Sequence, residues 1–147
     1  MLTVLNEFIR ECPSIHVKRR LNTLAELFAS RGVPQCIRSD NGPEFVSKAI
    51  RRCLSQLKIN SLYIEPGAPW ENGYAESFNS RFRDEFLAVE VFENLGTARR
   101  LTVAWKEDYN RQRPHSSLGY VTQAEFSSRC AVSNRAAPSF QLHSEIT

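Results

Sequence analysis

The chain has 147 residues, of which 41% are hydrophobic and 24% are charged, so its composition predicts one folded domain and excludes broad disorder. Its apolar runs are far too short to cross a bilayer, and its first residues lack the pattern of a secretory signal. We therefore expect a soluble, cytoplasmic protein without membrane partners. The formal net charge of +3 is too small to indicate nucleic acid by itself.

The order of apolar runs and helix breakers predicts an α/β protein in which helices flank a sheet. The expected elements are strands at 2–5 and 14–17, a helix from 22 or 23 that Gly32 and Pro34 end, a strand at 35–39, a helix at 44–57, a strand at 61–64, and helices at 71–87 and 97–109. The periodic pattern of apolar residues is lost after Phe126. We therefore expect a core at 1–129 and a loosely ordered C-terminal tail at 130–147.

The cysteines and histidines form no recognisable site. The four cysteines contain no C-x-x-C pair, and the three histidines complete no zinc pattern. Disulfides are not expected inside a cell. We interpret the cysteines as small buried or incidental thiols.

Asp40 follows a predicted buried strand and begins a turn, which is the edge of an α/β sheet where ligands usually bind. Asp-Asn-Gly is also ordinary turn chemistry, so by itself this position favours a turn or a helix cap.

Aromatic residues recur at every fourth position of the helix expected at 71–87, and this spacing predicts a buried face. They are Tyr74, Phe78, Phe82 and Phe86. Glu76 lies about 200° around the helix from this aromatic ladder. It belongs to a polar stripe with Asn72, Asn79 and Arg83. By itself the stripe favours a solvated helix face over one wall of a site.

Two segments contain basic residues and no acid, which fits either a solvated face or a contact with nucleic acid. The first, at 46–58, contains Lys48, Arg51, Arg52 and Lys58. The second, at 109–120, contains Arg111, Arg113 and His115. Arginines without neighbouring acids suit phosphate contact. The alternative is that Tyr109, Leu118 and Tyr120 hold this second segment against the sheet.

Three blocks of the sequence resemble the integrase catalytic core of bacterial insertion-sequence transposases, in the family's order and at its spacing. They are IRSDNGPEF at 37–45, PWENGYAESFN at 69–79 and YNRQRPHSSLGY at 109–120. The resemblance extends over residues 2–129. It implies a ribonuclease H-like mixed sheet flanked by helices, and DNA integration and recombination by metal-dependent phosphodiester cleavage and strand transfer.

Residue by residue, the resemblance assigns Asp40 and Glu76 as the second and third acids of the Asp–Asp–Glu triad. Both would be catalytic and would ligate Mg²⁺ or Mn²⁺, ions that prefer oxygen ligands. The family's first acid lies on a strand ahead of the one that begins at Leu2. We therefore expect this chain to lack its first strand and first acid, to bind metal weakly and to be inactive or weak.

The resemblance implies DNA as the partner, both transposon ends and target. The side chains expected to contact it are Lys48, Arg51, Arg52, Lys58, Asn72, Asn79, Arg81, Arg83, Arg111 and Arg113. The missing strand would leave unpaired backbone that invites self-association or pairing with a full-length transposase. The alternative function is that of a non-catalytic DNA-binding or interfering fragment. A ribonuclease H-like nuclease of another kind is disfavoured by the block at 109–120.

Overall fold

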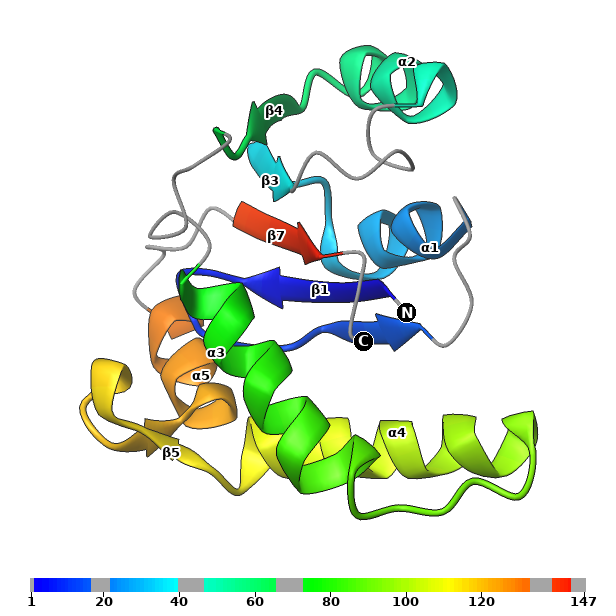
Figure 1. The fold of residues 1–147 in the computed structure, drawn as a ribbon. Coiled ribbons are helices and arrows are strands. Elements are labelled where there is room, and N and C mark those ends of the chain that lie inside the picture. Colours follow the sequence, from blue (N-terminus) through cyan, green and yellow to red (C-terminus); the bar gives the residue numbers. More distant parts are fainter. Residues whose placement is uncertain (1, 17–21, 40–46, 66–72, 133–138, 144–147) are drawn as a thin grey trace.

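The computed structural model describes residues 2–16, 22–39, 47–65, 73–132 and 139–143 (Figure 1). Its elements are β1 (Leu2–Asn6), β2 (Ser14–His16), α1 (Asn22–Arg31), β3 (Cys36–Ser39), α2 (Lys48–Gln56), β4 (Asn60–Tyr63), α3 (Gly73–Phe82), the π-helical turn η2 (Arg83–Leu87), α4 (Leu95–Arg111), β5 (Pro114–His115), the 3-10 turn η3 (Ser116–Leu118), β6 (Val121–Thr122), α5 (Gln123–Val132) and β7 (Ser139–His143). No helix in these ranges is long and apolar enough to cross a membrane.

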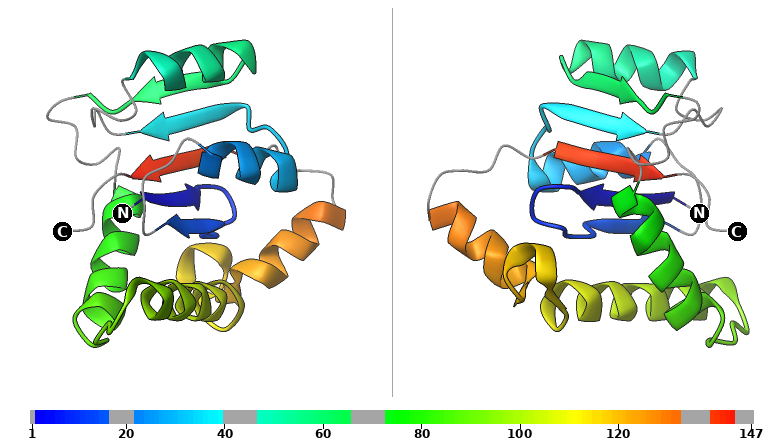
Figure 2. Two further views of the ribbon diagram at one scale, coloured as in Figure 1. Left: turned by 90° about the vertical axis from the view of Figure 1, so that its right-hand side faces the viewer. Right: turned by 60° about the vertical axis from the view of Figure 1, so that its left-hand side comes forward.

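The central element is a five-stranded mixed sheet with the order β2-β1-β7-β3-β4. Strand β1 is antiparallel to both β2 and β7, whereas β3 is parallel to both β7 and β4. Strands β5 and β6 form a separate two-stranded sheet. Helices α1 and α3 lie on opposite faces of the large sheet, as the two views in Figure 2 show.

Successive residues of β1 contribute to two hydrophobic cores, because side chains alternate between the faces of a strand. Val4 belongs to a cluster with residues of α1, β3 and α2, and Leu5 belongs to a cluster with residues of α3 and α4. The second cluster is largely aromatic. In it the Phe78 and Tyr109 rings meet edge to face at 5.0 Å, and the Phe82 and Trp105 rings meet at 4.8 Å.

Most of the expected elements are confirmed, and the starts of two helices differ from the expectation because of their capping residues. Helix α2 begins at Lys48, with Ser47 as its N-cap, rather than in the segment at 44–46, which lies outside the described residues. Helix α4 begins at Leu95 because the Asn94 side chain accepts a hydrogen bond from the Thr97 N–H at 2.9 Å. Gly32, with a φ of 86°, follows the end of α1.

The C-terminal segment differs from the expectation of a loosely ordered tail. Helix α5 continues to Val132, and Ser139–His143 forms β7 in the middle of the large sheet. The sheet therefore shows no open edge on β1, because β2 pairs with one side of it and β7 with the other. The segment satisfies backbone groups of β1 and β3 that would otherwise lack partners. Its sequence, Ser-Phe-Gln-Leu-His, alternates polar and apolar residues, which is a strand signal.

Candidate functional site

The carboxyl end of β3 is the described part of the chain that precedes Asp40 in the sequence. Ser39 is the last residue of this strand and is buried. Its carbonyl accepts a hydrogen bond from the Ile64 N–H at 3.1 Å, which ties the end of β3 to the residue after β4. Asp40 comes next in the sequence and lies outside the described residues, as does Asn72.

Glu76 is exposed in the first turn of α3. Its carboxylate forms no ion pair or side-chain hydrogen bond within the described ranges. The aromatic ladder on the same helix is buried against α4 from Phe78 onward, and Tyr74 is half-buried beside it. Glu76 therefore presents an exposed carboxylate, without a partner among the described residues, on the side of α3 that does not pack against α4.

The polar stripe expected on α3 does not extend to Asn79, and burial contradicts the expectation that this residue contacts DNA. Asn79 is only 4% exposed, and the Thr3 hydroxyl lies 3.5 Å from its Oδ1. The helix buries a second row of residues, Ala75 and Asn79, in addition to the aromatic ladder. A helix packed against both a sheet and another helix buries more than one stripe.

The predicted basic residues fall into two separate groups. Lys48, Arg51 and Arg52 are exposed on α2, and Lys58 is exposed just after it. Helix α2 lies beside the edge strand β4 (Figure 1). Arg81 and Arg83 are exposed at the other end of the sheet, where α3 and η2 approach α4. The structure does not bring the two groups together.

The arginines of the segment at 109–120 are balanced by acids, contrary to the expectation from their sequence neighbourhood. Arg111 pairs with Glu107 at 2.8 Å. Arg113 pairs with Glu85 and, at 3.1 Å, with Asp108. These acids come from α4 and η2, so the sequence block alone does not contain them.

The aromatic and apolar residues of the same segment divide between two environments. Tyr109 and Leu118 are buried, as the structural alternative requires, whereas Tyr120 is 76% exposed. The guanidinium of Arg113 lies 5.3 Å from the centre of the Trp105 ring. Tyr109 and Leu118 thus fit the alternative in which they hold this segment against the rest of the fold, and Tyr120 does not.

One polar pocket of the structure was not predicted from the sequence. Ser77, His115, Ser116 and Ser117 line it together with Arg10, Tyr74, Arg81 and Tyr109. The available signal was the spacing of Tyr74, Ser77 and Arg81, which places all three on one side of α3. Neither in this pocket nor in the rest of the described ranges do three His, Cys, Asp or Glu side chains form a group that could hold a metal ion.

Comparison with known families and proteins identifies what the chain resembles. The family model described as "Integrase core domain" matches residues 57–122. The chain is 41% identical over 145 residues to a 39.2 kDa protein of insertion element IS476 from Xanthomonas euvesicatoria, covering 93% of this chain and 42% of that protein. It is 38% identical over 149 residues to a 31.7 kDa protein of insertion element IS407 from Burkholderia multivorans, covering 95% of this chain and 53% of that protein. The chain thus spans about half the length of these curated relatives.

Two solved structures share the fold. One is a chain of the simian T-cell lymphotropic virus intasome in complex with a PP2A regulatory subunit, with a TM-score of 0.63 and 20% identity over 85% of this chain and 47% of that chain. The other is the HTLV-2 integrase catalytic core domain in complex with magnesium, with a TM-score of 0.62 and 18% identity over 85% of this chain and 82% of that chain. The predicted ribonuclease H-like α/β fold is confirmed.

Proposed function

The chain belongs to the integrase core family of insertion elements, and from this premise we propose that it is the core of a transposase that cleaves and joins DNA strands. The observation that carries the proposal is the carboxylate of Glu76 in the first turn of α3, which is exposed and has no partner among the described residues. Acids on protein surfaces usually serve as solvated charges. This one lies in a block, at 69–79, that matches the family's motif.

A divalent metal is the cofactor that we propose, and Asp40 and Glu76 are the residues that would hold it. The exposed carboxylate of Glu76 fits a hard cation, because Mg²⁺ and Mn²⁺ take oxygen ligands and keep several waters. When bound, such an ion supplies positive charge to a phosphate that undergoes displacement. Two carboxylates provide little negative charge to hold such a cation, so we expect weak metal binding.

Arg83 is the first residue of η2, which continues α3. We propose that it contacts the DNA substrate on the same side of the helix as Glu76. It is seven residues after Glu76, which places it on nearly the same side and about 10 Å further along the helix axis. Its exposed guanidinium would contact a phosphate next to the one that reacts. We expect both transposon ends and target DNA to bind, in the bacterial cytoplasm.

The experiment that tests this function measures nicking of supercoiled plasmid DNA in Mn²⁺ by the chain and by its Glu76→Gln variant. We expect slow nicking by the unchanged chain and at least a tenfold lower rate, about 1.4 kcal/mol in activation free energy, for the variant. Glu65→Gln is the control, since Glu65 is an exposed acid outside the matched blocks. Equal nicking by all three proteins would overturn the proposal.

A second candidate function is DNA binding without chemistry, and the surface of α2 favours it. Lys48, Arg51 and Arg52 are exposed there, and no acid lies in the helix. A fragment that binds phosphates through this surface could compete with a longer transposase for element ends. Plasmid nicking at the same rate with and without the chain, together with tight DNA binding, would favour this candidate.

Self-association is the further partner interaction that we propose. Strand β4 is an edge strand that pairs only with β3 in the described sheet, and Leu62 on it is exposed. Open strand edges accept strands of other chains. A second copy or a longer transposase could pair there, which sedimentation at increasing concentration would detect.

A further inference from the structure

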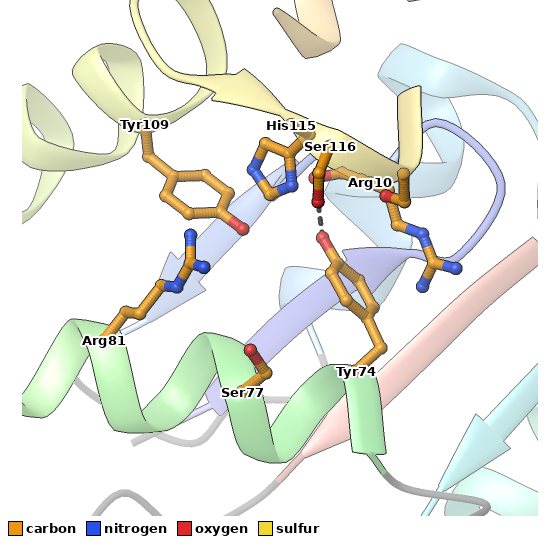
Figure 3. Close-up of a pocket in the computed structure, with 8 residues that line it drawn as sticks. Arg10, Tyr74, Ser77, Arg81, Tyr109, His115 and Ser116 are labelled. Carbon is orange, nitrogen blue, oxygen red and sulfur yellow. Dashed lines mark hydrogen bonds between the residues drawn. The ribbon is translucent and has the colours of Figure 1, made fainter. Parts of the chain in front are cut away.

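A pocket with a volume of about 270 Å³ lies between α3, α4 and the β5–η3 segment (Figure 3). Tyr74, Ser77 and Arg81 reach it from α3, Tyr109 from α4, and His115 and Ser116 from β5 and η3. Its residues come from three separate parts of the chain. It therefore exists only in the folded protein.

The pocket is separate from the carboxylate site. On a helix with 100° between successive residues, Ser77 lies about 100° and Arg81 about 140° around the axis from Glu76. The pocket therefore opens on another side of α3. An occupant there would not contact the metal ligands of the proposed function.

The charges around the pocket are positive. Arg81 is exposed and forms no ion pair with a carboxylate in the described part of the chain. No Asp or Glu is among the residues that line the pocket. In Figure 3 the Arg81 side chain extends toward the Tyr109 hydroxyl, with the imidazole of His115 on the far side of that ring. The pocket thus combines an imidazole with a cation that no carboxylate of the described residues balances.

His115 supplies the buried polar atom of the pocket that lacks a partner. Its Nε2 is inaccessible to solvent and forms no hydrogen bond within the described residues. Burial lowers the pKa of His115, and the nearby charges of Arg81, Arg10 and Arg113 lower it further. Of these three arginines, Arg113 is already paired with Glu85 and Asp108. An anion in the pocket would interact with the positive potential of the other two arginines, Arg81 and Arg10.

The hydroxyl groups in the pocket are neutral and can donate hydrogen bonds. Burial raises the pKa of Tyr109 to about 12, so its phenol stays protonated. Tyr74 also stays protonated and donates to the Arg10 carbonyl at 2.6 Å, which fixes the side of the pocket that Arg10 forms. Ser77 and Ser116 add hydroxyls. A guanidinium with several neutral donors and no carboxylate is the set of groups that phosphate oxygens need.

From this arrangement we infer that the pocket binds a phosphate group, supplied either by the backbone of bound DNA or by a free phosphate compound. The inference goes beyond the proposed function, because it uses neither Asp40 nor Glu76. Arg81 would pair with the phosphate, while the hydroxyls of Ser77, Ser116 and Tyr109 would donate to its remaining oxygens.

Calorimetry with inorganic phosphate, in the absence of divalent metal, tests the inference on the full chain. We expect saturable binding that Arg81→Gln weakens about tenfold, the loss of one charge-assisted hydrogen bond. Arg99→Gln is the matched control, because it removes an exposed arginine of α4 that lies outside the pocket and is not among the expected DNA contacts. Ser77→Leu fills the pocket without changing its charge, and this variant should abolish phosphate binding. It decides the outcome if Arg81→Gln fails to fold.

Competition separates the two sources of phosphate. Displacement of bound inorganic phosphate by a short DNA duplex would assign the pocket to DNA backbone, and its retention would assign it to free phosphate. Unchanged phosphate affinity in both pocket variants, or no saturable binding by the unchanged chain, would overturn the inference. Glu76→Gln should bind phosphate normally, so failure of the proposed function leaves this result intact.

Discussion

Cys12 and Asn110, 98 residues apart in the sequence, are joined by two hydrogen bonds. The Cys12 N–H donates to Asn110 Oδ1 at 2.8 Å, and Asn110 Nδ2 donates to the Cys12 carbonyl at 2.9 Å. Both residues are buried. The amide side chain thus acts like a neighbouring strand, because it satisfies both backbone groups of one residue and ties the loop after β1 to α4.

Replacing Asn110 by alanine should therefore destabilise the fold. The variant leaves a buried N–H and a buried C=O without partners, and we expect a loss of about 2–4 kcal/mol in the free energy of unfolding. Urea denaturation followed by circular dichroism measures it. Gln112→Ala, at an exposed position two residues away, should change stability by less than about 0.5 kcal/mol. Equal effects of the two substitutions would contradict the bridging role.

Arg113 should act on stability rather than on DNA affinity. Its guanidinium is paired with Glu85 and Asp108 and lies over Trp105, with 29% of the side chain exposed. We expect Arg113→Ala to cost about 1 kcal/mol in the free energy of unfolding, since partly exposed pairs contribute little individually.

The matched comparison for this arginine is Arg111→Ala, whose single ion pair is more exposed and should contribute almost nothing. Thermal denaturation and fluorescence anisotropy with a labelled duplex measure the two effects. A loss of DNA affinity in Arg113→Ala with an unchanged melting temperature would restore the phosphate-contact hypothesis.

Strand β7 should be essential for folding. Its backbone pairs with β1 on one side and with β3 on the other. Gln141→Pro removes a backbone donor from the centre of this sheet and should abolish the cooperative thermal transition. Gln141→Ala keeps the donor and should retain that transition. A cooperative transition of normal midpoint in the proline variant would show that β7 contributes little to the folded state.

The sequence predicts elements whose signals are local. The aromatic ladder is visible in its spacing, and it is buried from Phe78 to Phe86 as expected. The pairing of Arg113 with Glu85 could not be predicted, because Glu85 lies 28 residues away and is brought close only by the packing of η2 on α4. The second partner, Asp108, is only five residues from Arg113 but lies just outside the block at 109–120. The burial of Asn79 likewise depends on contact with β1, a segment 76 residues earlier.

The position of β7 in the centre of the sheet could not be predicted from the sequence either. Our expectation from the sequence is a loosely ordered tail at 130–147, and although the alternation in Ser139–His143 is compatible with a strand, nothing local indicates that a strand there lies between β1 and β3. For the candidate site, the sequence blocks predict Asp40 and Glu76 as metal ligands, and the structure adds the exposure of Glu76. The phosphate pocket combines residues of three segments, which no single block contains.

The exposed cations of α2 and of the residue just after it should contribute electrostatic, sequence-independent DNA affinity. Neutralising Lys48, Arg51, Arg52 and Lys58 should weaken binding to every duplex. The slope of log affinity against log salt concentration should fall by about one for each phosphate that the variant no longer neutralises. Anisotropy titrations over a range of salt concentrations measure this slope.

Arg99→Gln with Arg100→Gln on α4 is the control for these cations, because both arginines are exposed on a different helix. This control should leave the slope as it is in the unchanged chain. An unchanged slope in the α2 variant would identify its cations as solvated charges.

The most direct test of the proposed carboxylate site is Mn²⁺ binding measured by calorimetry. We predict weak binding by the unchanged chain and a clear reduction of affinity in both Asp40→Asn and Glu76→Gln, because each removes one of the oxygen ligands that hold the ion. Glu65→Gln should bind as the unchanged chain does, since this exposed acid belongs to neither matched block. Equal Mn²⁺ affinity in all four proteins would contradict the assignment of Asp40 and Glu76.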